Sequence, residues 1–506
     1  MNIRQSLLAL AVALPISALA QDSQPASLQP VVPMTISQAS MPESVAFFYM
    51  RELQTVPASR VAEIREEVQQ WRGFVHDRLR KVGNQWARPD AFKHKRDVFT
   101  KYMLEASQEL KPTKTDGEKR SAPKTEAEKR SAAAKAGVKV MQAALAWEDP
   151  VMRDYLVALA TLRAGNAQRA QTAAADCVKV APFVPAFQEL HGMTLLASDK
   201  PMEAVVALTN AARLRSDRET LALLKQSLDK VPGNEITDSR YKAGQAILTQ
   251  MTSSSSSFAS SSSVDLLKVT PPLPGKSASS YSLLGGNMGS LLPTPAFDRL
   301  TYRQGVGLPV TKNGLLVDAA TLEGAVDIFV RIDSDTYVPA KVKKLSVSSK
   351  AKLPPLALVT VDGYEFTPVD LAKESAIEDG LRVGSFGLGL YVEMGVTPRG
   401  VRGRITIARD GSITMGSELQ PGETTAPVLT NDDKLCGMLL GRTDISVDDG
   451  GPAKFLSIKD LQPLFDLLKK PGVSGSGISS SKTVTTRPAE GKTFTVVTIV
   501  PELFDR

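Results

Sequence analysis

The sequence predicts a multidomain α + β protein, in which an N-terminal α-helical region precedes a C-terminal all-β region. Three observations support this fold class. Apolar residues recur at helical spacing up to about residue 250, residues 252–263 read TSSSSSFASSSS, and short Val-, Ile- and Thr-rich runs between turn residues follow residue 264. A Ser-rich run has almost nothing that can pack, so residues 251–264 are predicted to form a linker.

Composition and charge narrow the classes of protein to which the chain can belong. Its 506 residues exceed one compact core, and 42% apolar with 23% charged residues is ordinary for globular domains. Two cysteines exclude a disulfide-rich scaffold and a zinc site of three or four thiolates, and the apolar sequence around Cys177 and Cys436 predicts buried free thiols. Residues 264–506 hold 27 basic and 27 acidic side chains, so the net charge of +7 belongs to residues 1–263. Its spread over helical segments favours a solvated surface over a nucleic-acid partner.

Residues 1–20, MNIRQSLLALAVALPISALA, have the three parts of an export signal. Arg4 supplies positive charge, residues 7–16 form a short apolar stretch, and Ala-Leu-Ala at 18–20 is a small-residue cleavage site. We therefore predict a signal peptide cleaved after Ala20 and a periplasmic or secreted protein; a buried N-terminal helix is the alternative. The sequence has no later run of about 20 uncharged apolar residues, so no membrane span is expected. Residues 21–42 are Gln-, Ser- and Pro-rich and are predicted to be extended.

Residues 43–250 are predicted to be α-helical. In the segment 61–82 the apolar residues fall at spacings of three and four and form one stripe, which comprises Val61, Ile64, Val68, Trp71, Val75 and Leu79. Residues 111–134 are charged and poor in apolar residues, and TDGEKRSA at 115–122 recurs there as TEAEKRSA at 125–132. We expect a disordered or loosely helical loop over 111–134.

A period of 34 residues is present between 151 and 232. It relates Ala158, Ala170, Cys177 and Pro182 to Gly192, Ala204, Ala211 and Ser216. Small residues at such positions let paired helices approach closely. The pattern resembles tetratricopeptide repeats, two complete and one partial, although the aromatic and Leu-Gly positions of that family are only partly present. Such repeats offer a concave groove for a peptide or a protein partner. A generic helical bundle is the alternative.

Residues 265–470 are predicted to form the all-β domain, a barrel or a sandwich. NDDK at 431–434 lies between two apolar runs and is expected to be a hairpin turn. LSIKDLQPLFDLLKK at 456–470 is expected to be an amphipathic helix with Leu461, Leu464, Phe465 and Leu468 on one face. Residues 471–506 are predicted to be a Gly- and Ser-rich tail with a possible strand at 492–500.

Five segments of this domain follow one another in a recognisable order: GVGLPVTKNGLLVDAATLEGA (305–325), PLALVTVDG (355–363), LRVGSFGLGLYVEMGVTPRGVRGRI (381–405), PGETTAPVLTNDDKLCGMLLG (421–441) and PAKFLSIKDLQPLFDLL (452–468). Together they resemble a trypsin-like serine protease, most closely the bacterial HtrA type. The first segment is similar to the histidine-bearing region of that family, the second to the aspartate-bearing strand, and the fourth to the nucleophile loop. The resemblance implies a double β-barrel.

The residues that would carry catalysis in such a protease are replaced. The resemblance puts Thr321 at the histidine position, Pro355 at the aspartate position and Thr424 at the serine position, with Gly422 and Thr424 as a residual oxyanion region. A hydroxyl nucleophile needs an adjacent base and an acid that orients the base. Residues 264–506 contain no histidine, and the chain has only His76, His94 and His191. The β-branched Thr425 follows the nucleophile position, where the family has glycine, which also puts the oxyanion hole in doubt.

The sequence therefore predicts an exported, catalytically inactive protease-like protein, a pseudoprotease, that binds a protein or peptide through its repeats or its degenerate cleft. No cofactor and no metal are expected. Two alternatives stay open. One is an active hydrolase with Thr424 as nucleophile and Lys434 or a docked histidine as base, or with Ser385 or Ser417 as nucleophile. The other is a structural or regulatory protein of the cell envelope.

Overall fold

The computed structural model describes part of the chain. The described residues are 41–82, 85–88, 93–110, 125–147, 149–253, 264, 266, 269, 271–274, 299–333, 336–343, 355–391, 399–416, 419–446, 454–468 and 493–502. The predicted signal peptide at 1–20, the extended segment up to residue 40 and the Ser-rich run at 254–263 lie outside these residues.

The N-terminal helices largely follow the predicted pattern. They are α2 (Pro42–Glu52), α3 (Val61–His76), α4 (Lys93–Leu110) and α5 (Glu126–Ala146). Ile64 and Val68 of the apolar stripe are the buried residues of α3. The continuous helix expected beyond residue 76 is wrong, because β1 (Arg80–Val82) pairs antiparallel with β2 (Gln85–Ala87). Gly83 and Asn84 stand between these strands in the sequence, and both residue types favour tight turns.

The second half of the predicted charged loop is helical, whereas residues 111–124 lie outside the described residues. Helix α5 starts at Glu126 because the repeated sequence TEAE makes a capping box. The Thr125 hydroxyl accepts a hydrogen bond from the Glu128 N–H at 3.2 Å, and the Glu128 carboxylate accepts one from the Thr125 N–H at 2.8 Å. Alanines at 132–134 then favour continuation of the helix.

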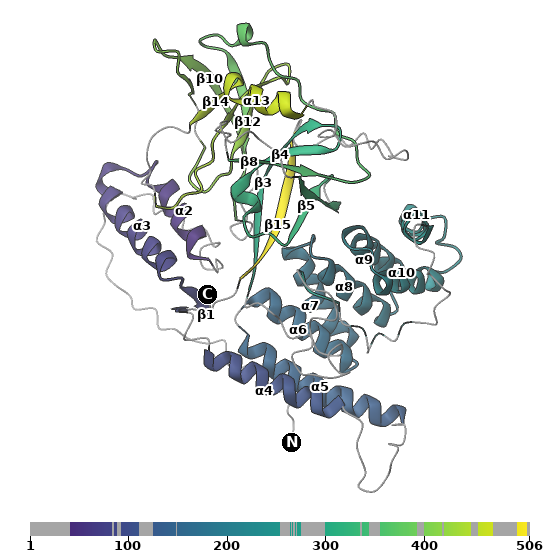
Figure 1. The fold of residues 1–506 in the computed structure, drawn as a ribbon. Helices are drawn as coiled ribbons and strands as arrows, with labels where there is room; N and C mark the ends of the chain where they lie inside the picture. The colour runs from purple at the N-terminus through teal and green to yellow at the C-terminus, as the bar shows by residue number, and fades with distance from the viewer. Residues whose placement is uncertain are drawn as a thin grey trace, which may run out of the picture. The chain divides into compact units, whose positions relative to one another are not determined.

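Three antiparallel helix pairs follow and are compatible with helical repeats. They are α6 (Pro150–Arg163) with α7 (Ala167–Val180), α8 (Pro185–Ala197) with α9 (Pro201–Leu214), and α10 (Arg218–Lys230) with α11 (Ser239–Ser253) (Figure 1). The small residues that define the 34-residue period are buried between the helices: Ala158, Ala170, Cys177, Gly192, Ala204 and Ala211. Their small side chains let the paired helices approach, as the sequence predicted.

The first β-barrel is a seven-stranded antiparallel sheet. Its strands are β3 (Arg299–Thr311), β4 (Gly314–Asp318), β5 (Asp327–Arg331), β6 (Tyr337–Pro339), β7 (Lys341–Lys343), β8 (Leu356–Thr360) and β15 (Phe494–Glu502), in the order β6-β5-β15-β3-β4-β8-β7. The two ends of this order, β6 and β7, are separated in the chain only by Ala340, so the sheet nearly closes on itself. Strand β15 lies between β3 and β5 (Figure 1). The barrel therefore includes the last described segment of the chain, which differs from the predicted domain end at 470.

The second barrel is a six-stranded antiparallel sheet. Its strands are β9 (Arg382–Gly387), β10 (Arg399–Ile407), β11 (Ile413–Met415), β12 (Ala426–Thr430), β13 (Leu435–Leu439) and β14 (Phe455–Ser457), in the order β11-β10-β9-β12-β13-β14. The end strands β11 and β14 contact each other. NDDK forms the predicted β12–β13 turn, and α13 (Ile458–Leu468) buries the predicted apolar face. Two nearly closed antiparallel barrels are compatible with a trypsin-like double barrel.

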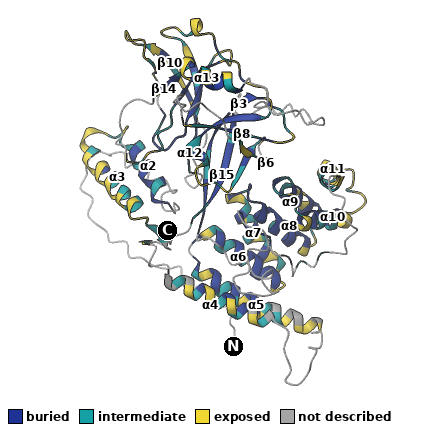
Figure 2. Ribbon diagram, viewed as in Figure 1, coloured by how far each residue is buried: buried dark blue, intermediate teal, exposed yellow. Residues whose placement is uncertain are grey.

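The helical repeats and the first barrel share one hydrophobic core. Figure 2 shows buried residues on the helices α6 to α9 and on the strands of the barrel. Phe183, before α8, packs edge-to-face against Tyr302 of β3 with ring centroids 5.3 Å apart. Asp149 caps α6 with one carboxylate oxygen, and its other oxygen accepts a hydrogen bond from Leu300 N at 3.2 Å. Cys177 and Cys436 are both buried and free, as predicted. The two regions are therefore joined by packing as well as by the chain between them.

Candidate functional site

The structure brings together the three chain segments that carry Thr321, Pro355 and Thr424. Thr321 lies in the short helix α12 (Ala319–Leu322), Pro355 precedes β8, and Thr424 lies in the turn before β12. The N–H of Ala319 donates a hydrogen bond to the Pro355 carbonyl at 2.9 Å. The N–H of Thr425 donates one to the Asp318 carboxylate, also at 2.9 Å. Hydrogen bonds from within three residues of the predicted positions thus join the three segments.

Asp318 joins helix α12 to the turn that holds Thr424. One carboxylate oxygen accepts a hydrogen bond from the Ala320 N–H at 2.9 Å and so caps α12. The other oxygen accepts bonds from the N–H and the hydroxyl of Thr425, at 2.9 and 2.7 Å. The Thr425 hydroxyl in turn accepts a bond from Gly441 N at 3.1 Å. A buried carboxylate with three donors thus joins helix α12 to the turn that holds Thr424 and Thr425. The sequence analysis missed Asp318, although Asp before a short Ala-rich helix is an N-cap signal.

Thr424 has surroundings that do not activate a hydroxyl. Its side chain is fully buried, and its Oγ1 donates a hydrogen bond to the Leu388 carbonyl at 3.3 Å. A peptide carbonyl is no base, because it cannot take up a proton near neutral pH. Thr321 is equally buried, and its hydroxyl has no hydrogen-bond partner among the described residues. In this structure neither side chain is therefore placed to act as an activated nucleophile or as a base.

The alternative bases lie elsewhere in the described structure. Lys434 is in the β12–β13 turn, where it pairs with Asp432 at 3.0 Å. Thr424 precedes the other end of β12, and a strand of this length separates its ends by about 15 Å. His76 contacts its neighbour Asp77 at the end of α3, and His191 lies in α8 of the repeats. The side chain of His94 is outside the described residues.

The alternative serine nucleophiles are Ser385 and Ser417. The Ser385 hydroxyl is buried in β9 and donates a hydrogen bond to the Pro427 carbonyl at 2.5 Å. As with Thr424, its acceptor is a peptide carbonyl and its surface is closed to a substrate. Ser417 lies outside the described residues.

The predicted oxyanion region at Gly422 and Thr424 is closed. An oxyanion hole needs N–H groups aimed at the position of the developing negative charge. The Gly422 N–H instead donates to the Arg442 carbonyl at 2.7 Å, and the Thr424 N–H donates to the Leu388 carbonyl at 2.9 Å. The Arg442 N–H completes the closure by donating to the Glu423 carbonyl at 3.0 Å. Gly441 permits this approach, because a Cβ there would lie 2.6 Å from the backbone of Thr424 and Thr425. Both expected donors are consumed by the protein's own backbone.

Helix α2 covers the same turn from outside. Phe47 packs directly on Gly422, which has a left-handed φ of 83° and whose missing Cβ would lie 2.8 Å from the Phe47 ring. The Phe47 ring also stacks on Tyr391 at a centroid distance of 6.3 Å. Arg51 Nε donates a hydrogen bond to the Pro421 carbonyl at 2.8 Å. The apolar residues of α2 gave no sign of their partner in the sequence, since the bond from Arg51 to Pro421 joins residues 370 positions apart.

In the described part of the chain, no group of three or more His, Cys, Asp or Glu side chains is placed to hold a metal ion. None of the described helices combines the length and apolar character that crossing a bilayer requires. Comparison of the chain with protein-family models and with curated proteins gives no match.

Proposed function

We propose that this chain is a catalytically inactive protease-like protein, a pseudoprotease related to the HtrA type, that serves as a protein- or peptide-binding scaffold. The proposal rests mainly on one observation, that both N–H groups expected to form the oxyanion hole already donate hydrogen bonds within the protein. Gly422 N–H and Thr424 N–H are both spent on backbone carbonyls. Removing even one such donor typically costs an acyl-transfer enzyme about 100- to 1,000-fold in rate.

The side chains support the same proposal. Thr424 has a carbonyl as its hydrogen-bond acceptor, Thr321 cannot act as a base, and Pro355 contributes a backbone carbonyl only. The barrels nevertheless keep well-packed cores, and the polar contacts around Asp318 replace a catalytic arrangement by a structural one. A fold retained without its chemistry favours a role in binding, and tetratricopeptide-like repeats supply a surface for it.

The experiment is a turnover and labelling assay on the full chain. Unfolded casein and a fluorophosphonate probe are each incubated with the wild type and with Thr424→Ala, which removes the hydroxyl in question together with the γ-methyl group. We expect no casein turnover and no probe label on residue 424. Turnover that Thr424→Ala abolishes would overturn the proposal.

A gain-of-function variant tests the oxyanion argument separately. Thr321→His, Pro355→Asp and Thr424→Ser together restore the three side-chain types of a protease. We expect this triple variant to remain inactive, because the Gly422 and Thr424 N–H groups stay bonded to Arg442 and Leu388. Activity well above that of the wild type would show that the turn can open and would contradict a closed scaffold.

Export of the chain is part of the proposal and is supported by residues 1–20 alone. Expression in a bacterial host should give a processed chain that begins at Gln21 and is released with the periplasmic fraction. N-terminal sequencing of an unprocessed chain from the cytoplasmic fraction would refute export without affecting the argument on catalysis.

A further inference from the structure

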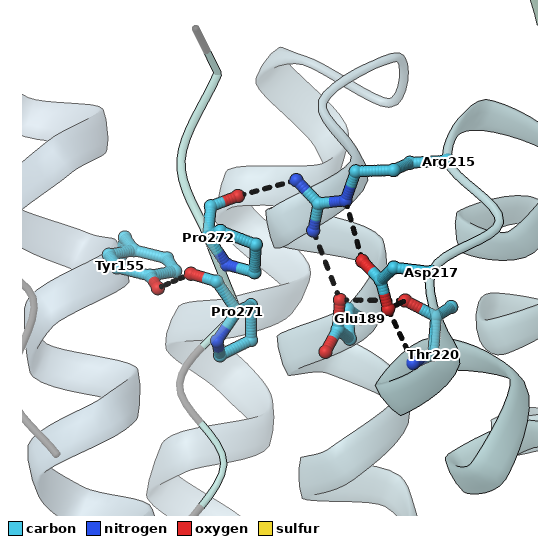
Figure 3. A network of polar contacts seen from close by, with 7 residues as sticks. All are labelled: Tyr155, Glu189, Arg215, Asp217, Thr220, Pro271 and Pro272. Carbon is cyan, nitrogen blue, oxygen red and sulfur yellow. Dashed lines mark hydrogen bonds and ion pairs between the residues drawn. The ribbon is translucent and has the colours of Figure 1, made fainter. Parts of the chain in front are cut away.

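The helical repeats hold an extended segment of the chain itself. The Tyr155 hydroxyl of α6 donates a hydrogen bond to the Pro271 carbonyl at 2.6 Å, and Arg215 Nη1 donates one to the Pro272 carbonyl at 2.7 Å (Figure 3). Tyr155 comes from the first helix of one pair, and Arg215 directly follows α9, the second helix of the next pair. The segment therefore lies across successive repeats, and two of its consecutive carbonyls accept hydrogen bonds from side chains of the repeats.

The side chains of this segment are buried against the helices. Val269 and Leu273 belong to the same hydrophobic core as the repeats, and Leu273 has no exposed surface. The sequence from 269 to 274 is Val-Thr-Pro-Pro-Leu-Pro. Three prolines in four residues favour an extended conformation before binding, which lowers the entropy lost on docking. The predicted boundary between linker and barrel at 264 differs from this arrangement, since Val264, Leu266, Val269 and Leu273 pack on the helices.

Arg215, which donates to the Pro272 carbonyl, is held in place by two carboxylates (Figure 3). Arg215 Nε donates to Asp217 at 2.9 Å, and Arg215 Nη2 donates to the fully buried Glu189 at 3.2 Å. Thr220 in α10 donates to Glu189 at 3.0 Å and so fixes the acceptor. An arginine held in this way loses little further freedom when it bonds a peptide carbonyl.

A cavity continues beyond the end of the segment. It has a volume of about 510 Å³ and is lined by Arg215, Leu273 and Pro274 on the helical side. Val326, Phe329 and Val342 of the first barrel line the other side, and Val326 and Val342 are about half exposed. An apolar residue that follows the last proline of a bound peptide would find space here.

We propose that the surface formed by Tyr155, Glu189, Arg215 and Thr220 is a docking groove for an extended proline-rich segment of a partner protein, and that residues 269–274 are its resident intramolecular occupant. The inference rests on the proposed binding function and names its ligand class. The partner peptide would carry an apolar residue, a Pro-Pro pair whose carbonyls accept hydrogen bonds from Tyr155 and Arg215, and a leucine. A tethered occupant acts at an effective concentration on the order of 1 mM, so a partner must bind tightly or the segment must be released.

The test uses the full chain and a fluorescent peptide with the sequence of residues 268–275, KVTPPLPG, measured by anisotropy. Leu273→Asp places a charge in the buried contact and releases the resident segment; Leu104→Asp puts the same charge on an exposed position of α4 and is the matched control. We expect Leu273→Asp to bind the peptide at least about tenfold more tightly than the wild type or the control, because it removes the tethered competitor. Tyr155→Phe, added to Leu273→Asp, should weaken binding about fivefold through the loss of one hydrogen bond.

Several results would overturn the groove. Leu273→Asp binding no more tightly than the wild type does so, and so does equal binding of KVTAALPG, in which the Pro-Pro pair is lost. If Leu273→Asp lowers the melting temperature, displacement of the resident segment is measured instead on the wild type in the presence of millimolar peptide. Amide exchange at Val269 and Leu273 must then rise, and unchanged exchange contradicts displacement. Mass spectrometry of the recovered peptide separates the two proposals: a cleaved peptide refutes the inactive scaffold, and an intact unbound peptide refutes the groove alone.

Discussion

Asp318 is the group that joins helix α12 to the turn at Thr425, so its removal should destabilise this part of the structure most directly. Asp318→Ala deletes the acceptor of three hydrogen bonds, from Ala320 N, Thr425 N and Thr425 Oγ1. The variant leaves the Thr425 N–H buried without its carboxylate and the N-terminus of α12 without its cap. Asp318→Asn is the near-isosteric comparison, because it keeps one acceptor oxygen for three donors.

The expected magnitude follows from these contacts. A hydrogen bond to a charged group contributes about 1.5–3 kcal/mol, and loss of a helix cap costs about 1 kcal/mol. Since the three bonds share one carboxylate and are not additive, we expect Asp318→Ala to lower the free energy of unfolding by about 3–5 kcal/mol. Asp318→Asn should cost about 2 kcal/mol, and Thr425→Val, which also leaves Gly441 N without its acceptor, about 1–2 kcal/mol.

The assay is urea denaturation followed by circular dichroism, with a double-mutant cycle between Asp318→Ala and Thr425→Val. Because both variants remove the hydrogen bond from Thr425 Oγ1 to Asp318 Oδ2, their effects should fall short of additivity by about 1 kcal/mol. An Asp318→Ala variant within about 0.5 kcal/mol of the wild type would refute the structural role of Asp318. Strict additivity in the cycle would refute its contact with Thr425.

Three further predictions concern α2, the repeat groove and Thr321. Phe47→Ala should release α2 from Gly422 and speed the amide exchange of residues 42–52 by about 100-fold, because truncation of a buried Phe costs about 3–5 kcal/mol. Phe48 is only half-buried, so Phe48→Ala is the control and should leave this exchange unchanged. Equal effects of the two variants would contradict the packing of α2 on Gly422. Burial, with a smaller contribution from the Asp217 charge, raises the pKa of Glu189 to about 7. The folded state therefore binds the proton more tightly than the unfolded state, and stability present below pH 4.5 is lost as pH rises through 7. Urea midpoints at pH 5 and pH 8 should differ less in Glu189→Gln, and an unchanged difference would refute this. Thr321→Val removes a buried hydroxyl without a partner among the described residues, so the melting temperature should hold or rise; a fall of several degrees would show a missed bond.

Local patterns in the sequence predicted local structure well. The stripe that includes Ile64 and Val68 became the buried face of α3, the 34-residue period became paired helices, and NDDK became a hairpin turn. Each of these features depends on residues close in the chain. The strand at 492–500 was also visible, but its place between β3 and β5 was not, since any edge of the barrel offers the same backbone groups.

Motif order predicted that the segments of Thr321, Pro355 and Thr424 lie together, and hydrogen bonds join these segments in the structure. Their role as a site stays a prediction. The bond from Asp318 to Thr425 spans 107 residues, and neither residue type specifies the other. The loss of the oxyanion donors depends on where the backbone of Arg442 lies, which no side-chain pattern encodes. Long-range backbone contacts therefore decide whether this turn could stabilise an oxyanion.

Amide hydrogen exchange at Gly422 and Thr424 tests the central claim most directly, because it reports on the two donors themselves. The exposed turn residue Gly363 provides the reference within the same chain. With both N–H groups bonded to carbonyls, at Arg442 and Leu388, each should exchange at least about 100-fold more slowly than Gly363. Exchange at both residues as fast as at Gly363 would show donors open to solvent and available to an oxyanion, and would contradict a protease-like scaffold closed to catalysis.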